Sequence, residues 1–204
     1  MPLLPDQVER EEAPETWDEL WDRLCLFHAT KLNELSEHND LTGNTTNYVP
    51  YTHKGWDVPI EGVGQGQAES VWVAEQLGRP VVKAWNAVLE GTLKARGVPA
   101  GTPGRIALPV AADSDEAKEV AMRLVDETGF DPFDAGKLAD SWRQQPATPA
   151  YCTELTLDEL GPALQAADRE KTPAIRDRQI EYLSSLPSLP PLDEIVEHNR
   201  SLYR

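Results

Sequence analysis

The sequence is poor in the features that usually identify a function. It has two cysteines, Cys25 and Cys152, and no CxxC pair, which is unlike a disulfide scaffold and typical of a reducing compartment. Its apolar stretches are short, so we expect no membrane-spanning segment. The segment 1–15 is acidic and lacks the cationic and apolar regions of a secretory signal, so we expect a cytoplasmic protein.

Positive charge is also scarce. The 204 residues include 19 Lys and Arg against 35 Asp and Glu, for a formal net charge of −16. Such a surface repels a phosphate backbone and an anionic lipid surface, so the composition predicts no nucleic acid and no membrane as partner. A small anionic ligand remains compatible with this charge, because local dipoles and side chains can outweigh it.

The familiar catalytic and cofactor motifs are missing as well. There is no GxxxxGK[ST], GxSxG or HExxH, and the four histidines (His28, His38, His53 and His198) lack the spacing of converging zinc ligands, so we expect no metal. The string GVGQGQ at 62–67 looks like a phosphate-binding glycine loop. However, no apolar strand precedes it and its spacing is not GxGxxG, which favours a flexible loop.

The first third of the chain predicts a tail, a helix and a loop. Residues 1–15 read as a solvated acidic tail. Residues 16–36 carry a broad apolar stripe, and Thr16 with Glu19 forms a capping box, which predicts a helix. Residues 37–66 are rich in Asn, Thr, Pro and Gly and are expected to form loops.

The middle of the chain alternates helical and strand patterns. Residues 69–77 predict a helix that ends at Gly78. A helix is also expected from Asp115 to Gly129, with Asp113 or Ser114 as its N-cap. Three apolar runs have strand length, at residues 79–85, 105–112 and 130–136.

Strands that alternate with helices predict parallel pairing and an α/β fold. We expect a partial Rossmann-like sheet, the later half of a doubly wound fold, with helical extensions at both ends. The predicted units are 1–43 (acidic tail and amphipathic helix), 44–155 (incomplete Rossmann-like domain) and 156–204 (helical extension). In the last unit, Thr156 and Glu159 form a second capping box.

Several polar and aromatic residues follow the predicted strands. In open α/β sheets, ligands bind outside the carboxyl ends of the strands. Trp85, Asn86 and Asp113 lie at two of these ends, 134–136 lies at the third, and Trp142 follows shortly after. The alternative is that the polar residues only cap helices, and both interpretations can hold together.

Four strings together resemble one known family. They are TTNYVP, VVKAWN, ALPVAADSDEAKEVAMRLVDETGFDPFDAG and LADSWRQQPATPAYCTEL, and they span roughly residues 44–169. In this order they are similar to the NADP-dependent oxidoreductases of the coenzyme F-420 (deazaflavin) reductase type. The resemblance implies an NADP(H) cofactor, with coenzyme F-420 or a similar small molecule as the second substrate. It places cofactor-binding residues at Thr46, Asn47, Tyr48, Trp85 and Asn86, and substrate-binding residues at Trp142 and Arg143.

The sequence departs from this family at the phosphate site. Family members begin with a βαβ unit that carries GxGxxG, and no such unit is present here. The strand expected before Thr46–Asn47 is replaced by the polar string HNDLTGN. Three hypotheses follow: a truncated or degenerate hydride-transferring oxidoreductase; a non-catalytic remnant that needs a second copy or a separate N-terminal half; or an unrelated binding module that keeps the fold.

Overall fold

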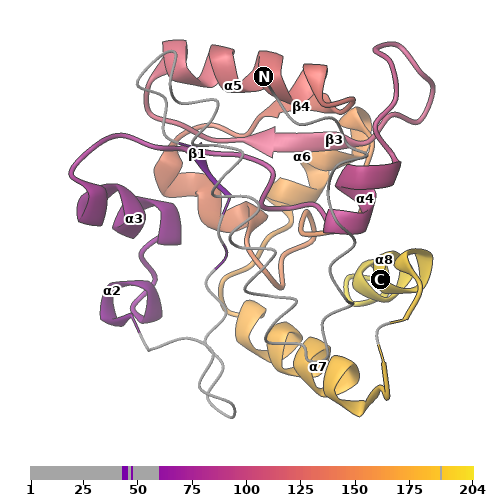
Figure 1. Ribbon diagram of the computed structural model, residues 1–204. Coiled ribbons are helices and arrows are strands. Elements are labelled where there is room, and N and C mark those ends of the chain that lie inside the picture. The colour runs from indigo at the N-terminus through magenta and orange to yellow at the C-terminus, as the bar shows by residue number, and fades with distance from the viewer. Residues whose placement is uncertain (1–42, 46, 48–59, 189) are drawn as a thin grey trace, which may run out of the picture.

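The computed structural model describes residues 43–45, 47, 60–188 and 190–204. The predicted tail, the predicted helix at 16–36, Thr46 and Tyr48 therefore lie outside the described residues. The described part is a mixed α/β structure in which short parallel strands are surrounded by helices (Figure 1). The domain boundaries given above stay a prediction. No described helix is long and apolar enough to cross a membrane.

The best-formed strand pair confirms the predicted strand–helix–strand unit. Strands β3 (Ala107–Val110) and β4 (Asp131–Asp134) are parallel, with Ala107 opposite Asp131 and Val110 opposite Asp134. Helix α5 (Asp115–Glu127) connects them. A parallel pair needs such a crossover, because no tight turn can return the chain to the same edge.

Helices cover both faces of this strand pair. Leu108 and Val110 pack in one core with Ala121 and Val125 of α5. Ala107, the residue before Leu108, faces the other way and packs with Leu160 and Leu164 of α6 (Leu157–Gln165). Because neighbouring strand residues point to opposite faces, the two cores lie on opposite sides. Figure 1 shows this layering, with α5 above β3 and α6 below it.

A second, shorter strand pair corrects one expectation. The polar string before Thr46–Asn47 does contain a strand, β1 (Gly43–Asn44), which pairs in parallel with β2 (Val82–Lys83). Asn44 is only 3% exposed, and its side-chain amide donates to Ser70 Oγ at 3.2 Å. A hydrogen-bonded partner allows a polar residue to be buried, which is why the apolar pattern failed to predict this strand.

The two strand pairs meet at a single point. The backbone N–H of Lys83 donates to Ala111 O at 2.8 Å, and that of Ala111 donates to Lys83 O at 3.0 Å, in an isolated antiparallel bridge. The expected parallel pairing of β2 with β3 is therefore absent from the described residues. Pro109 gives a physical reason. The backbones of Ile106 and Val110 bond to β4 and that of Ala111 bonds to Lys83, so Pro109 faces the β2 side by alternation, and it has no N–H to donate there.

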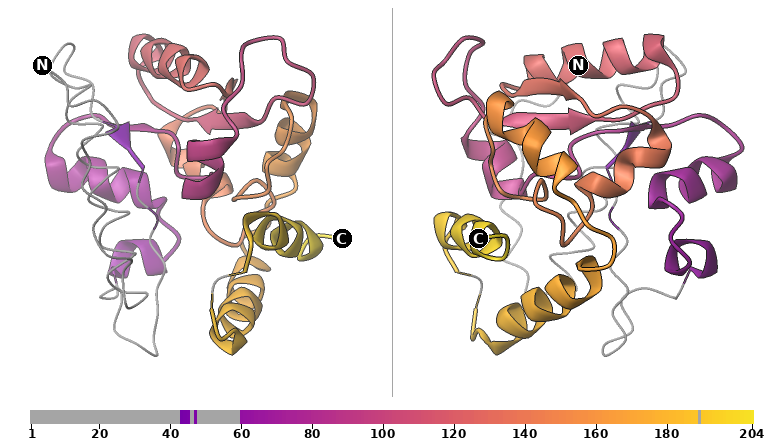
Figure 2. Two further views of the ribbon diagram at one scale, coloured as in Figure 1. Left: turned by 45° about the vertical axis from the view of Figure 1, so that its right-hand side comes forward. Right: turned by 180° about the vertical axis from the view of Figure 1, so that it is seen from behind.

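The remaining helices lie around this sheet. Segment 62–67 differs from the expected flexible loop, because its first residues belong to a short helix, α2. The C-terminal region is helical, as predicted, and α7 and α8 lie side by side (Figure 2), where the rings of Tyr182 and His198 stack at a centroid distance of 3.6 Å. These elements are α2 (Glu61–Gly64), α3 (Glu69–Leu77), α4 (Glu90–Ala95), the 3-10 helix η2 (Leu138–Gln144), α7 (Thr172–Ser185) and α8 (Leu192–Ser201).

The predicted helix ends are confirmed. Gly78 ends α3 in the left-handed conformation, at φ 64°. The choice of N-cap for α5 falls on Ser114, whose Oγ accepts from the N–H of Ala117 at 3.2 Å. At α6, Glu159 accepts hydrogen bonds from the N–H and the hydroxyl of Thr156, both at 2.9 Å. The sequence therefore predicted the residues that cap or end these three helices.

Gly129, which follows α5, is needed for two reasons. Its φ of 93° lies in the left-handed region, which glycine adopts without strain. A Cβ at this position would also lie 2.6 Å from Gly97 Cα, since the two backbones touch there. The contact positions β4, because the N–H of Val98 donates to Gly129 O at 3.0 Å.

Replacing Gly129 with Ala is expected to destabilise the fold by about 2–4 kcal/mol, from backbone strain and overpacking together. Gly101 is the matched control, because its φ is 80° but a Cβ there would meet nothing within 4 Å. Gly101→Ala should show only the strain, about 1 kcal/mol. Urea unfolding of both variants measures the difference, and equal losses would contradict the close contact at Gly129.

Candidate functional site

Two asparagines meet where β1 and β2 end. Asn47 follows β1, and its Nδ2 donates to Asn86 O at 2.9 Å. Asn86 follows β2, and its Nδ2 donates to Asn47 Oδ1 at 3.0 Å. These residues are 39 positions apart in the sequence, and the carboxyl ends of the parallel strands bring them together. The structure thus joins two of the predicted cofactor-binding residues.

Helix η2 supplies a third amide that the sequence did not predict. Gln144 Nε2 donates to Asn86 Oδ1 at 2.9 Å, and Asn86 Nδ2 also donates to Gln144 O at 2.6 Å. The Asn86 amide, in a residue that is 2% exposed, is thus fully hydrogen-bonded inside the protein. We call Asn47, Asn86 and Gln144 the amide cluster.

The buried face of η2 has two polar atoms without a partner among the described residues. Ser141 Oγ and Gln144 Oε1 are both buried and form no hydrogen bond with that part of the chain. Together with Leu138 they repeat every three residues, the period of a 3-10 helix. This spacing was visible in the sequence and could have identified Gln144. Such unpaired groups are uncommon in a protein interior, and they often mark a bound water or a functional position.

A buried ion pair lies beside the amide cluster. Lys83 of β2 is 0% exposed, and its Nζ donates to Oε2 of Glu69, which is 4% exposed, at the start of α3. Gln145 Nε2 also approaches Glu69 Oε2, at 3.4 Å. Burial lowers the pKa of Lys83, while the charge and the hydrogen bond of Glu69 act in the opposite direction. The pair therefore attaches α3 to the sheet beneath the cluster.

Trp85 lies in the α5 core. Its side chain is packed with Leu108, Val110 and other core residues, the residue is 8% exposed, and Nε1 donates to Thr128 Oγ1 at 3.3 Å. Its φ of 55° is unusual for a residue other than glycine. The turn after β2 therefore sends Trp85 into the core and Asn86 into the amide cluster. The expectation that Trp85 stacks on a cofactor ring stays a prediction.

The two predicted substrate residues lie on η2. Arg143 Cζ lies 4.5 Å from the centre of the Trp142 ring. Arg169, which the sequence did not single out, lies at 4.4 Å from the same ring. Guanidinium groups at this distance from an indole form cation–π contacts. The structure thus groups Trp142 and Arg143 with a second arginine.

The aspartates at the other strand ends have structural partners. Asp113 Oδ1 accepts from the N–H of Leu138 at 3.1 Å. Asp134 Oδ1 accepts from Lys118 Nζ at 2.9 Å and from the N–H of Gly136 at 2.8 Å. These contacts hold the turns after β3 and β4, which supports a local structural role for both aspartates.

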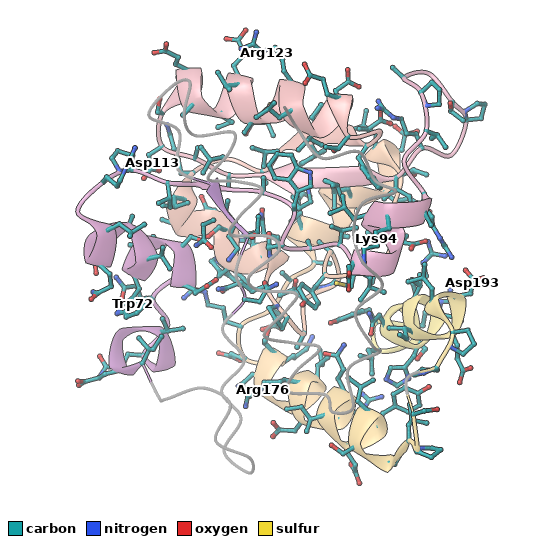
Figure 3. All side chains as sticks on the ribbon, viewed as in Figure 1. Trp72, Lys94, Asp113, Arg123, Arg176 and Asp193 are labelled. Carbon is teal, nitrogen blue, oxygen red and sulfur yellow. The ribbon has the colours of Figure 1, made fainter. Side chains whose placement is uncertain are left out.

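A surface hollow of about 500 Å³ is lined by residues along α5 and by Pro132 and Asp134 of β4. Charged residues of α5 line it, including Asp115, Glu119 and Arg123, with Met122 and Pro132 as apolar residues. Figure 3 shows Arg123 projecting from α5 away from the strands. None of the residues that line the hollow belongs to the amide cluster. In the described part of the chain, no group of three or more Asp, Glu, His or Cys side chains is arranged to hold a metal ion.

Two of the three glycines in segment 62–67, Gly62 and Gly66, have no room for a pyrophosphate beside them. A Cβ at Gly62 would lie 2.4 Å from Gln67 Oε1, and one at Gly66 would lie 3.2 Å from Arg169 Nη1. The chain's own side chains therefore occupy the space that a phosphate would need against these backbones. Among the described residues, this segment forms no cradle for a dinucleotide.

Cys152 is not a reactive thiol in this structure. It is 2% exposed, its N–H donates to Ala87 O at 3.0 Å, and its carbonyl accepts from Asn199 Nδ2 at 3.0 Å. Burial raises the pKa of the thiol to about 12. Since the thiolate is the nucleophile, this residue has a structural role.

Comparison with known proteins identifies a relative by sequence. The chain is 37% identical over 105 residues to the provisionally named YjhV protein of Escherichia coli strain K12. The matched region covers 52% of this chain and 77% of YjhV. At this identity and coverage, the chain belongs to the same family as YjhV. No protein-family model matches the chain.

Two solved structures show partial similarity to the chain. One is the hypothetical protein SMa0349 from Sinorhizobium meliloti, at 24% identity and a TM-score of 0.47, covering 61% of this chain and 60% of that one. The other, from Arthrobacter sp. FB24, is provisionally assigned as an F420-dependent NADP reductase, at 18% identity and a TM-score of 0.38, covering 55% and 53%. This chain therefore matches less than two thirds of the length of either structure.

The buried pair predicts a non-additive response. Lys83→Met alone or Glu69→Leu alone should cost about 3–5 kcal/mol, because each removes the opposite charge from a buried ionic group. The double variant should be more stable than either single one, since it removes both buried charges together. Denaturant unfolding of the four proteins measures this cycle. Additive losses in the double variant would show that the two charges do not interact.

Cys152 predicts a stability change at alkaline pH. The thiol ionises near pH 8.5 in the unfolded chain but at about 12 in the folded one, so its contribution to stability is complete below pH 8.5 and is lost as pH rises towards 12. Between pH 9 and 11, by this linkage, the parent protein should lose roughly 1 kcal/mol per pH unit more than Cys152→Ala. If the free energy of unfolding fell equally with pH in the parent and in Cys152→Ala, the burial of this thiol would be contradicted.

Proposed function

We propose that the chain is an NAD(P)-dependent oxidoreductase-like protein that transfers a hydride between NADPH and a deazaflavin or a similar acceptor. The observation that supports this most directly is the amide cluster. It gathers two residues that the family resemblance assigned to the cofactor, at the edge of the sheet where open α/β proteins bind ligands. The cofactor supplies the redox chemistry, and the protein's part is to bind and orient it.

Within this proposal the amide cluster is a positioning device. Asn86 and Gln144 are buried, whereas Asn47 is only half-buried, so Asn47 is the member that can face a bound ring. Its orientation is set by the reciprocal hydrogen bonds with Asn86. Trp142 and Arg143 would contact the second substrate. A second copy of the chain, or a chain carrying the GxGxxG unit, would add the phosphate contacts that segment 62–67 does not make.

A second candidate is a binding module without catalysis. It is favoured because Lys83, Trp85 and Asn86 are all occupied by contacts within the chain. A protein that keeps these residues for its own folding has fewer groups left for a cofactor. In this case the chain would fold cooperatively and show no response to a nicotinamide nucleotide.

Thermal unfolding with millimolar NADPH tests the proposal. A nucleotide present at about 100 times its dissociation constant should stabilise the folded state by roughly 2.7 kcal/mol. Asn47→Ala should lower the midpoint and also abolish most of this stabilisation. Asn44→Ala is the matched control, because it removes the same amide three residues earlier, where the side chain contacts Ser70. It should lower the midpoint but keep the response to NADPH.

Hydride transfer is measured separately, by the loss of NADPH absorbance when an oxidised deazaflavin is added in the absence of oxygen, with NADP+ and the reduced deazaflavin as the products. The proposal expects turnover by the parent chain, and less turnover by Asn47→Ala. A cooperatively folded parent that shows neither stabilisation nor turnover would contradict the oxidoreductase and favour the binding module. Equal responses in both Asn variants would remove the amide cluster from the site.

A further inference from the structure

Two separate segments bring arginines to one tryptophan ring. Helix η2 contributes Trp142 and Arg143, and the segment after α6 contributes Arg169, which also contacts Gly66 in the turn between α2 and α3. Arg169 Nη1 donates to Gly66 O, and Arg143 Nη1 donates to Leu164 O at 3.3 Å. Each guanidinium is therefore held by two contacts, one with the indole ring and one with a backbone carbonyl. We call Trp142, Arg143 and Arg169 the arginine clamp.

No carboxylate in the described part of the chain pairs with the two arginines of the clamp. Within the described part of the chain, neither Arg143 nor Arg169 forms an ion pair, whereas Arg96 and Arg105 each contact two carboxylates. Two positive groups within 4.5 Å of one ring centre also repel each other. A bound anion would relieve this repulsion.

The chemistry of the clamp specifies the kind of anion. Guanidinium carries five N–H donors in a planar fork that matches the oxygens of a carboxylate or a phosphate. One donor of each arginine is used by a carbonyl, so several remain for a ligand. The indole edge adds an apolar surface beside the charge.

We propose that the arginine clamp is a binding site for the carboxylate or phosphate group of a small molecule. This inference rests on the proposed function in one respect, because it states the chemistry of the second substrate at Trp142 and Arg143. It also assigns a role to segment 62–67. The turn that fails to cradle a pyrophosphate instead holds Arg169 in place through Gly66 O.

The binding test uses simple anions in the absence of nucleotide. Inorganic phosphate and citrate are titrated separately into the parent chain by calorimetry at low salt. We expect saturable binding of at least one of them, and the preferred anion shows whether the site takes a phosphate or a carboxylate. Arg143→Gln and Arg169→Gln should each weaken that binding about tenfold or more, because a charge-assisted hydrogen bond is lost.

Arg123→Gln is the matched control. It removes the same charge from the exposed surface of α5, where Arg123 projects away from the sheet (Figure 3). This variant should bind the anion as the parent does, so a general effect of net charge can be separated from the clamp. Arg169→Lys keeps the charge but loses the fork, and it should bind more weakly than the parent.

Two results would overturn the inference: no saturable binding of either anion by the folded parent, or equal weakening in the Arg123, Arg143 and Arg169 variants. Both are distinct from failure of the proposed function. Anion binding without any response to NADPH would support the clamp and contradict the oxidoreductase. Stabilisation by NADPH without binding of either anion would support the oxidoreductase and contradict the clamp.

Discussion

The charged side chain of Lys83 is the constraint on which the rest of the structure depends. Its backbone pairs β2 with β1 on one side and with Ala111 on the other, so this residue joins the two strand pairs. Its side chain is buried and needs a counter-charge, which Glu69 supplies from α3. One residue thus determines both how the sheet continues and which helix covers it.

The same constraint explains an unusual helix. Helix α3 buries its polar residues Glu69 and Ser70, while Val71, Trp72 and Val73 are half-exposed. An ordinary amphipathic helix does the opposite. The inversion follows because the sheet presents Lys83 and Asn44 to this helix instead of apolar side chains. With α3 held in this way, η2 can pack beside it and complete the amide cluster.

Local patterns in the sequence predicted the parts of the fold that depend on local chemistry. The β3–α5–β4 unit, the caps at Ser114 and Thr156 and the end of α3 at Gly78 all followed from patterns within a few residues. Strand β1 escaped prediction because its burial depends on Ser70, which is distant in the sequence. The bridge between β2 and β3 escaped because one proline interrupts the donors of an otherwise ordinary strand.

The candidate site was predicted only in outline, for a similar reason. Positions at or after strand ends suggested Trp85, Asn86 and Trp142, and the family resemblance added Asn47 and Arg143. Gln144 and Arg169 join them through contacts between η2, α6 and the α2–α3 turn, which no single segment encodes.

Amide hydrogen exchange in the native state tests most directly whether Lys83 unites the two strand pairs. If it does, the amides of Lys83 and Ala111 should exchange through the same opening as the amide of Ala135, which bonds across β3 and β4 to Val110 O. All three should then show one free energy of opening. Fast exchange at Lys83 and Ala111 beside a protected Ala135 would contradict the account, because the strand pairs would then open independently.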